Sequence, residues 1–478
     1  MSSVSRIRQT KLIATLGPAC DDVGILAQML HAGMNVARLN FSHGTHAEHA
    51  ARLERLAQAS ERAGRTVATM LDTRGIEIRV GDFAAGVVEL EPGQEFVLDP
   101  AIASGDARGV AVNQPGLGRA LSEGDPVLLD DGSIELVVTA VDGDRLTCRV
   151  ETGGPLRSRK GVNLPHTDLN YRPMGPENEE DLRFAAEHGM DYVAASFVRN
   201  AADVLELRAI LDANGADTPI IAKIENRSGV EHLAEIVAAA NGTMVARGDL
   251  GVELPVEDVP SVQKKIIRAT VMQGKPVITA TQMLDSMERN PRPTRAEASD
   301  VANAIYDGTS AVMLSGETAV GKYPVAAVRT MAKLAQKAEA SLGEYGHLQH
   351  VHPDTGNQVS EAVSQAAITM AQHLHAAAIV TLTESGFTSR MISKYRPACP
   401  ILAVTGSARV ERRLCMNWGI TALRYSDDHD DDQKIGFAIE RAREIGYVVP
   451  GDVVIVTAGL SMQSGSTDMI RVLTVGGA

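Results

Sequence analysis

The sequence predicts an α/β protein built around a closed barrel of eight parallel strands. Short runs rich in Val, Ile and Thr alternate along the chain with longer amphipathic stretches rich in Ala and Leu, which is the pattern of βα units and of a parallel sheet. Eight such runs occur, and eight is the number of strands that closes a TIM (β/α)8 barrel.

The predicted strands follow one another with a single interruption. They occupy residues 11–17, 34–41, 66–73, 192–198, 219–225, 242–249, 276–282 and 311–317. Turn residues follow every strand, and a helical pattern follows every strand except the third. The third strand therefore marks an insertion into the barrel.

The inserted segment has a different texture from the barrel. Residues 86–96 and 124–150 are short apolar runs divided by Gly, Asp and Pro turns, which predicts a small all-β domain. A domain inserted at a βα loop can close over the top face of a barrel as a lid. We expect a β-barrel lid domain at 74–162, with the two barrel segments at 1–73 and 163–343.

The end of the chain predicts one further domain. A polar stretch containing His residues, 344–358, follows the barrel, and beyond it a helix alternates with the apolar strands 377–383, 400–406 and 452–459. This alternation predicts a separate C-terminal α/β domain at 344–478.

The charge balance and the cysteines exclude several classes of function. Asp and Glu total 60 against 46 Lys and Arg, a formal charge of −14, so nucleic acid and anionic membranes are poor partners. The 4 cysteines are scattered without a CxxC pair, which argues against both a disulfide framework and a zinc site. With neither a signal-peptide pattern nor an apolar run of transmembrane length, the protein is expected to be cytoplasmic.

Polar residues gather at the ends of the predicted strands, where the active site of such a barrel lies. Arg38, Asn40 and Ser42 end the second strand, and alternation sends them to one side. A guanidinium beside neutral oxygen atoms suits a phosphate and a cation. Asp72 and Thr73 add a carboxylate and a hydroxyl at the end of the third strand.

The later strands supply more charge. Lys223 and Glu225 are two residues apart and face the same side, although unpaired buried charge is costly. The sixth strand leads to Gly248 and Asp249, where a glycine lets backbone N–H groups approach an anion closely. The seventh strand ends at Thr281.

Ser315 and Glu317 follow the eighth strand. Each of these strand ends taken alone is compatible with a structural ion pair. Together they place two carboxylates opposite a lysine and an arginine, which is the minimal set for a divalent metal that bridges an anionic substrate.

The motifs resemble, in order and over essentially the whole chain, those of the pyruvate kinase family. They are ATLGPA (14–19), GMNVARLNFSHG (33–44), SRKGVNLP (158–165), AKIENRSGV (222–230), MVARGDLGVELP (244–255), ATQMLDSM (280–287), the run 293–324, TESGFTSR (383–390) and SGSTDMIRV (464–472). The resemblance implies transfer of the phosphoryl group of phosphoenolpyruvate to ADP, giving pyruvate and ATP. It also implies a phosphorylated activator, either a sugar phosphate or a nucleotide, and a homotetramer.

The resemblance also assigns roles to matching residues. The substrate-binding residues would be Arg38, Lys223, Gly248, Asp249 and Thr281. The catalytic residues would be Arg38, Lys223, Thr281, Ser315 and Glu317. Mg²⁺ or Mn²⁺ would be held by Glu225 and Asp249, and K⁺ by Asn40, Ser42, Asp72 and Thr73. The nucleotide would meet Asn40, His43, Arg79, Asp131 and Lys160.

The lid hinge departs from the family pattern. Ile76 stands where the family usually has proline, which frees the backbone there, and Glu77 keeps the usual glutamate. Family members that do not require K⁺ carry lysine at this position. The resemblance therefore implies that Glu77 favours K⁺ dependence.

The C-terminal domain resembles the effector domain of the family. The turn Thr383, Glu384, Ser385, Gly386, Phe387 and Thr388 would bind the effector phosphate, with 464–467 covering it. A plain strand–helix turn is the alternative, and Phe387 disfavours fructose 1,6-bisphosphate because that position is commonly small or basic.

Two other functions compete with this one. A carbon–carbon lyase or mutase acting on pyruvate or phosphoenolpyruvate on the same barrel would share the AKIEN strand, but it needs no nucleotide lid. A catalytically silent regulator would not need Arg38, Lys223, Glu225, Asp249 and Thr281 to be intact.

Overall fold

The predicted eight-stranded barrel is present and closed. The computed structural model describes residues 8–75, 78–130, 132–165, 175–346, 358–425, 430–459 and 467–476. The barrel strands are β1 (Lys11–Thr15), β2 (Val36–Asn40), β3 (Ala68–Asp72), β12 (Tyr192–Ala195), β13 (Ile220–Ile224), β14 (Gly242–Ala246), β15 (Val277–Ala280) and β16 (Ala311–Leu314). They are all parallel, and β1 closes the ring by pairing with both β2 and β16.

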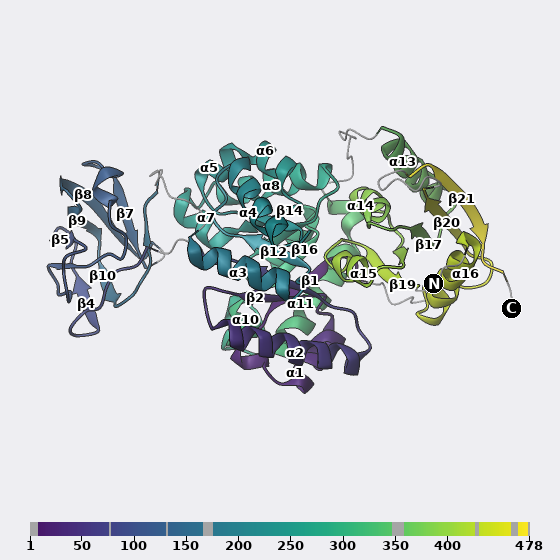
Figure 1. Cartoon of the computed structure of the whole chain (residues 1–478), viewed down its shortest axis with the longest axis horizontal. Coiled ribbons are helices and arrows are strands. Elements are labelled where there is room, and N and C mark those ends of the chain that lie inside the picture. The colour runs from purple at the N-terminus through teal and green to yellow at the C-terminus, as the bar shows by residue number, and fades with distance from the viewer. Residues whose placement is uncertain are drawn as a thin grey trace.

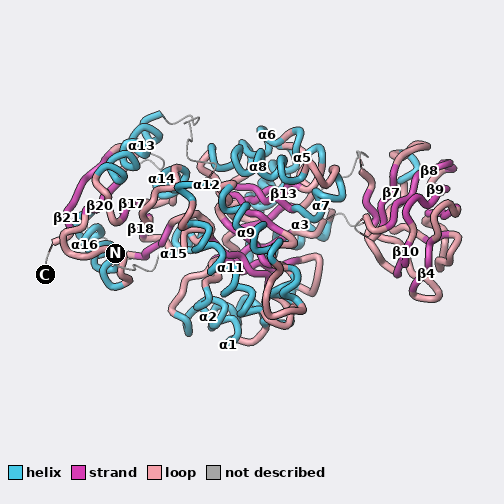
Figure 2. Tube along the Cα trace, turned by 180° about the vertical axis from the view of Figure 1, so that it is seen from behind, coloured by secondary structure: helices cyan, strands magenta, loops and turns pink. Residues whose placement is uncertain are grey.

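Helices surround the strands, as the magenta core and cyan shell of Figure 2 show. The longer ones are α1 (Val23–Ala32), α2 (His46–Ala63), α3 (Pro176–Glu187), α4 (Ala201–Ala213), α8 (Val259–Met272), α9 (Arg295–Tyr306) and α11 (Pro324–Glu339). The shorter ones are α5 (Arg227–Glu231), α6 (Leu233–Ala239), α7 (Arg247–Glu253), α10 (Gly316–Ala319) and α12 (Leu342–Tyr345), with 3₁₀ turns at Pro18–Cys20 and Asp285–Glu288.

Local sequence sets where these helices begin. The Thr45 hydroxyl accepts from the N–H of Glu48 and the Glu48 carboxylate accepts from the N–H of Thr45, which is a capping box at the start of α2. Thr294 and Glu297 form the same box before α9. Each box starts the helix that follows a strand and a polar turn, so the βα alternation is encoded locally as well as by hydrophobic periodicity.

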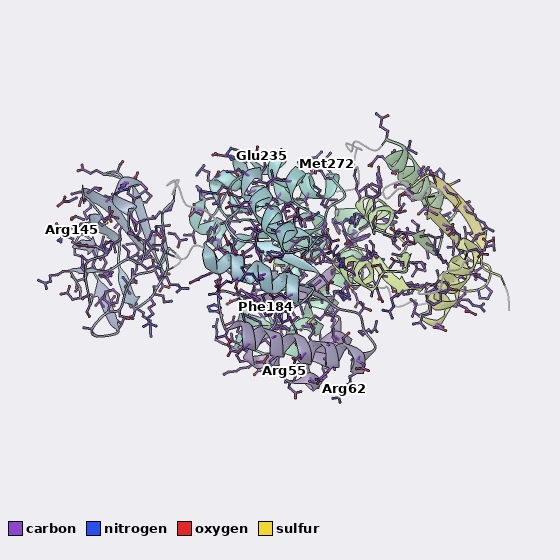
Figure 3. The ribbon with its side chains drawn as sticks, in the orientation of Figure 1. Arg55, Arg62, Arg145, Phe184, Glu235 and Met272 are labelled. Carbon is purple, nitrogen blue, oxygen red and sulfur yellow. The ribbon has the colours of Figure 1, made fainter. Side chains whose placement is uncertain are left out.

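Aromatic packing joins neighbouring barrel helices. Phe184 on α3 packs edge-on against Phe41, the residue after β2, with ring centroids 5.2 Å apart, and stacks on His188 at 3.8 Å. Figure 3 shows Phe184 beside α2, while Arg55 and Arg62 on α2 point outward. The apolar face of each helix therefore covers the barrel and its charged face meets solvent.

The inserted segment forms an all-β domain with its own core. Its strands are β4 (Val87–Leu90), β5 (Glu95–Leu98), β6 (Gly109–Val110), β7 (Pro126–Leu129), β8 (Ile134–Asp142), β9 (Arg145–Thr152), β10 (Gly154–Arg157) and β11 (Val162–Asn163), with a 3₁₀ turn at Leu117–Arg119. They make a six-stranded sheet ordered β11-β7-β8-β9-β5-β6 and the pair β10-β4. The domain stands apart at one end of the long axis, and Arg145 marks its far side (Figures 1 and 3).

The C-terminal domain lies at the opposite end of the long axis (Figure 1). Its elements are α13 (Gln358–His373), β17 (Ala378–Leu382), α14 (Phe387–Lys394), β18 (Ile401–Thr405), α15 (Ala408–Leu414), β19 (Ile420–Arg424), α16 (Asp431–Glu444), β20 (Val453–Ala458) and β21 (Met469–Thr474). The sheet order is β19-β18-β17-β20-β21, and only the β20–β21 pairing is antiparallel.

This domain closes the floor of the barrel, where the strands begin. Met416 is fully buried and packs among the interior side chains of the barrel, including Ile13, Met70 and Met244. The Lys11 ammonium donates to the Ile420 carbonyl at 2.6 Å, and Arg412 pairs with the buried Asp191 at 2.9 Å. The floor and the polar rim are thus the two ends of the same strands.

Among the described residues, no helix combines the length and the apolar character that crossing a membrane requires.

Candidate active site

The rim of the barrel carries a row of alternating charges. The Asp72 carboxylate accepts from Arg38 Nε at 2.6 Å and pairs with Lys223 Nζ at 3.1 Å. Lys223 also pairs with Glu225 at 2.9 Å, as the strand alternation predicts. The side chains of Asp72 and Glu225 are each only 1% exposed, so the charged groups at the ends of β2, β3 and β13 are held away from water.

Asp72 and Lys223 hold each other in the ionised state. Burial acts to raise the pKa of Asp72, but Arg38 and Lys223 outweigh it and keep the pKa below its usual value. Burial likewise acts to lower the pKa of Lys223, but Asp72 and Glu225 outweigh it and raise that pKa. The ammonium therefore remains charged across the physiological range.

The carboxyl groups of Glu225 and Asp249 also interact with each other. Burial, together with the negative charge of Asp249, raises the pKa of Glu225 to about 7 even though Lys223 opposes the shift. Burial also raises the pKa of Asp249. Two buried carboxyls that repel each other are stabilised when a cation enters between them.

The structure places Gly248 and Asp249 in the first turn of α7, because the strand before them ends at Ala246. The N–H of Gly248 donates to the Thr281 hydroxyl at 2.7 Å, and that hydroxyl donates to the Ala280 carbonyl at 2.7 Å. Thr281 thus ties the end of β15 to the start of α7.

Thr281 also has a strained backbone. Its φ is 67° and that of Gln282 is 52°, in the left-handed region that β-branched residues avoid. Arg247 braces the turn by donating to the Thr281 carbonyl at 2.7 Å while pairing with Asp300 at 2.7 Å. Such strain costs on the order of 1–3 kcal/mol and is retained where geometry matters.

Ser315 and Glu317 lie together beyond β16. The Glu317 carboxylate accepts from the N–H groups of Ser315 at 2.7 Å and Leu284 at 3.0 Å. Burial raises the pKa of Glu317, although these two N–H groups oppose the shift. The Glu317 carboxylate therefore joins the backbone that follows the seventh strand to the backbone that follows the eighth strand.

The end of the second strand differs from the expected alternation. β2 stops at Asn40, and Ser42 lies in the turn that follows, where its N–H donates to Asn40 Oδ1 at 3.2 Å. Asn40 and Arg38 alternate along a strand as predicted, but Ser42 approaches them through a turn instead. Thr73 contributes both its hydroxyl and its carbonyl, which accept from the N–H and the hydroxyl of Ser196 at 3.0 and 2.7 Å.

The residues expected around the nucleotide are divided between two bodies. Asn40 and the exposed His43 belong to the barrel. In the inserted domain, Arg79 Nη1 donates to the Arg159 carbonyl at 2.8 Å and Lys160 pairs with Asp130 at 2.7 Å. Asp131, Ile76 and Glu77 lie outside the described residues.

The expected effector turn joins β17 to α14. The Thr383 hydroxyl accepts from the N–H of Gly386 at 2.9 Å, and Gly386 has a φ of 79°. The hydroxyls of Thr388 and Thr467 are 2.8 Å apart. Glu384 and Ser385 are exposed at the tip, Phe387 begins α14, and the covering residues 464–466 lie outside the described part of the chain.

Three residues at this rim were not expected from the sequence, and they lie on the first strand or directly after the fourth. Thr15 on β1 accepts from Arg38 Nη1 at 2.9 Å. After β12, the Ser196 hydroxyl lies 2.9 Å from Lys223 Nζ and the N–H of Phe197 donates to Glu225 at 2.6 Å. The order of the barrel strands could have located them, because β12 lies between β3 and β13.

Glu225 and Asp249 could hold a divalent metal together with other ligands. Across the described ranges, no group of three or more His, Cys, Asp or Glu side chains is arranged to bind a metal ion. Divalent cations of the Mg²⁺ type commonly take one or two carboxylates plus substrate and water oxygens. A metal at this rim would therefore be shared between the protein and its substrate.

Comparison with known proteins covers both the barrel and the C-terminal domain. The family model described as pyruvate kinase, barrel domain, matches residues 7–328, and the one described as pyruvate kinase, alpha/beta domain, matches residues 361–473.

Relatives named pyruvate kinase align with nearly the whole chain. One from Geobacillus stearothermophilus is 48% identical over 97% of this chain and 80% of its own length. One from Bacillus licheniformis is 45% identical over 98% of this chain and 81% of its own. One from Clostridium acetobutylicum is 43% identical over 98% of this chain and 100% of its own.

Proposed function

The chain belongs to the pyruvate kinase family and is a phosphotransferase, and from this premise we propose how its own residues move the phosphoryl group from phosphoenolpyruvate to ADP. The observation that carries the proposal is the buried row of Arg38, Asp72, Lys223 and Glu225 at the strand ends. Phosphoryl transfer depends mainly on positioning and on charge held in place beforehand. In this row, Arg38 and Lys223 are the two fixed cations, and the carboxyl groups of Asp72 and Glu225 are their partners.

The alternative functions find no support in the comparisons. The relatives that match almost the whole chain are named pyruvate kinase, not carbon–carbon lyase or mutase. A silent regulator is disfavoured because the five residues expected to carry the chemistry are all present.

We assign the phosphoryl group to Arg38 and Lys223. Arg38 uses Nε for Asp72 and Nη1 for Thr15, which fixes the plane of the guanidinium and leaves Nη2 to face a ligand. Lys223 is a compact cation held by two carboxylates, so it can neutralise charge on a phosphoryl group as it passes between oxygens. Both cations belong to rigid strands, which limits reorganisation during transfer.

We assign the divalent ion, Mg²⁺ or Mn²⁺, to Glu225 and Asp249. Their chemistry fits such an ion, because burial raises both pKa values and a cation would relieve the repulsion between them. When bound, the ion would supply a Lewis acid that grips the substrate carboxylate. Gly248 and Asp249 lie in the first turn of α7, where backbone N–H groups favour an anion, and the Thr281 hydroxyl lies beside them.

We assign K⁺ to Asn40, Ser42, Asp72 and Thr73. Three of these residues offer neutral oxygens, and the one carboxylate already serves Arg38 and Lys223. Neutral oxygens with one shared charge suit a monovalent cation better than a divalent one. The family generally needs both Mg²⁺ and K⁺, which supports the assignment.

We place proton delivery at Thr281, with Ser315 and Glu317 behind it. The enolate left after transfer must gain a proton to become pyruvate. Thr281 Oγ1 carries a proton that it donates to the Ala280 carbonyl at 2.7 Å, and its strained φ of 67° holds it at the rim. Glu317 is buried with a raised pKa beside Ser315, which suits exchange of a proton between this group and water.

The remaining assignments concern the nucleotide, the effector and assembly. We place ADP against Asn40 and His43 on the barrel and Arg79, Asp131 and Lys160 on the inserted domain, whose closure would exclude water. A sugar phosphate or nucleotide would bind at residues 383–388, where the first N–H groups of α14 lie beside three hydroxyls. The chain would assemble as a homotetramer.

A coupled assay of pyruvate formation from phosphoenolpyruvate tests the proposal. With ADP, Mg²⁺ and K⁺ present we expect ADP-dependent turnover, and absence of ATP formation would refute it. Lys223→Met should abolish phosphoryl transfer while pyruvate still exchanges its methyl protons with solvent, because that exchange does not need the lysine. Equal loss of both activities would contradict the division of labour between Lys223 and Thr281.

A further inference from the structure

The fourth barrel strand, β12, ends between β3, which carries Asp72, and β13, which carries Lys223. β12 pairs with β3 on one side, with Ala194 opposite Asp72, and with β13 on the other, with Ala195 opposite Ala222. The residue after this strand, Ser196, therefore lies between Asp72 and Thr73 on one side and Lys223 on the other. Ser196 is buried, with 6% of its surface exposed.

Only one assignment of donors and acceptors fits the hydrogen bonds of the Ser196 hydroxyl. Its oxygen lies 2.9 Å from Lys223 Nζ, 2.7 Å from the Thr73 carbonyl and 3.4 Å from Asp72 Oδ1. An ammonium only donates, so the hydroxyl oxygen must accept from Lys223. Its single proton then goes to the closest acceptor, the Thr73 carbonyl.

The three protons of the Lys223 ammonium consequently have three partners. They are Ser196 at 2.9 Å, Glu225 at 2.9 Å and Asp72 at 3.1 Å, one from each of three neighbouring strands. Three acceptors in different directions define a point, whereas two leave the flexible lysine free to swing about the line between them.

The three partners differ in what else they bind. Asp72 also accepts from Arg38 at 2.6 Å, and Glu225 also accepts from the N–H of Phe197 at 2.6 Å. Both carboxylates are shared with other groups of the site. The Ser196 hydroxyl is the neutral acceptor of the three, and its own proton is committed to the backbone of the neighbouring strand.

We propose that Ser196 is a positioning residue for phosphoryl transfer, which fixes the Lys223 ammonium by accepting its third hydrogen bond. This inference deepens the function proposed above and rests on it. Loss of a hydrogen bond to a charged group corresponds to a decrease in kcat of about ten- to a hundredfold. The KM for phosphoenolpyruvate should change by less than about threefold, because the ion pairs that hold the charges in place remain.

Three variants of Ser196 separate hydrogen bonding from packing. Ser196→Ala removes the acceptor, and Ser196→Cys keeps the volume but offers only a weak acceptor. Ser196→Thr restores the hydroxyl. We expect the first two to lose kcat to a similar extent and Ser196→Thr to return to within about threefold of the wild type.

Ser393→Ala is the matched control. Ser393 is a buried serine of the C-terminal domain whose hydroxyl donates to the Trp418 carbonyl at 2.6 Å, so it resembles Ser196 in burial and in its backbone bond but lies remote from the rim. Its kcat should equal that of the wild type. Ser196→Ala should lower the Tm no more than this control does.

The full chain is assayed for ATP formation, for solvent proton exchange on pyruvate and for Tm. We expect Ser196→Ala to lose phosphoryl transfer at least threefold more than proton exchange, at every K⁺ concentration. Full recovery of kcat at high K⁺ would overturn the inference, since the serine would then act through Thr73 and the monovalent site. Wild-type kcat in Ser196→Ala or Ser196→Cys would overturn it as well. Inactivity of the wild type would instead refute the proposed function.

Discussion

Replacing Gly75 by alanine tests whether the hinge of the inserted domain is mechanically tied to Glu225. An added Cβ at Gly75 would lie 2.4 Å from Cε2 and 2.8 Å from Cδ2 of Phe197. Both distances are shorter than carbon atoms tolerate, so the ring must move. Phe197 has a φ of 53°, and its N–H donates to Glu225 Oε2 at 2.6 Å. Displacing the ring therefore disturbs a backbone that holds the carboxylate.

The expected size of the effect follows from these contacts. Overpacking of this kind costs about 1–3 kcal/mol. A hydrogen bond to a charged group contributes about 1.5–3 kcal/mol. If the strain is relieved by releasing Glu225, the Mg²⁺ concentration needed for half-maximal activity should rise by about ten- to a hundredfold. The KM for ADP should change much less.

The assay is ATP formation at varied Mg²⁺, with Mn²⁺ binding followed independently by electron paramagnetic resonance. Gly175→Ala is the control, because its backbone is extended and no atom lies within 4 Å of an added Cβ. The double variant Gly75→Ala/Phe197→Leu should recover part of the metal affinity, since the smaller side chain removes the clash. A Mg²⁺ requirement in Gly75→Ala equal to that of Gly175→Ala would refute the reasoning.

Two further predictions concern the barrel floor and the monovalent cation. Burial lowers the pKa of Lys11 from 10.5 to about 8. Between pH 8 and pH 10.5 the unfolded chain therefore binds a proton that the folded chain does not. The free energy of unfolding of the wild type consequently rises with pH over this range, by up to about 3 kcal/mol. Lys11→Met lacks this rise, and its Tm relative to the wild type should therefore fall from pH 7 to pH 10; a pH-independent difference would contradict the lowered pKa. Because Glu77 is retained, activity in Na⁺-free buffer should depend on added K⁺, and equal activity with and without K⁺ would exclude that dependence.

The architecture could be predicted from the sequence because local sequence patterns encode it. Hydrophobic periodicity located all eight barrel strands, and local side-chain pairs such as Thr294 with Glu297 start helices between them. The predicted strands were too long at their carboxyl ends, where Gly248 and Ser315 belong to the beginnings of α7 and α10. Those ends turn sharply to bring backbone N–H groups to the rim, and periodicity does not report a turn of that kind.

The site was predicted less completely for a different reason. Charged residues such as Lys223 and Glu225 stand out because burying them demands an explanation, whereas Thr15 and Ser196 are ordinary residues in a strand. Their importance comes only from their neighbours in the closed sheet, since β1 meets β2 and β12 meets β13. Phe197 escaped notice for the same reason, because its backbone N–H, not its side chain, contacts Glu225.

The Met416 side chain at the barrel floor has a consequence for how the protein is made. The last barrel strand ends at Leu314, but the interior that the strands enclose receives Met416 from a domain synthesised later. A nascent chain that has released all eight strands from the ribosome would still have a cavity at the base of its barrel. Removing a buried methionine side chain from a core costs about 2–5 kcal/mol. The barrel should therefore mature only after the C-terminal domain has emerged, and premature termination anywhere before that point should leave a species that chaperones bind and proteases remove.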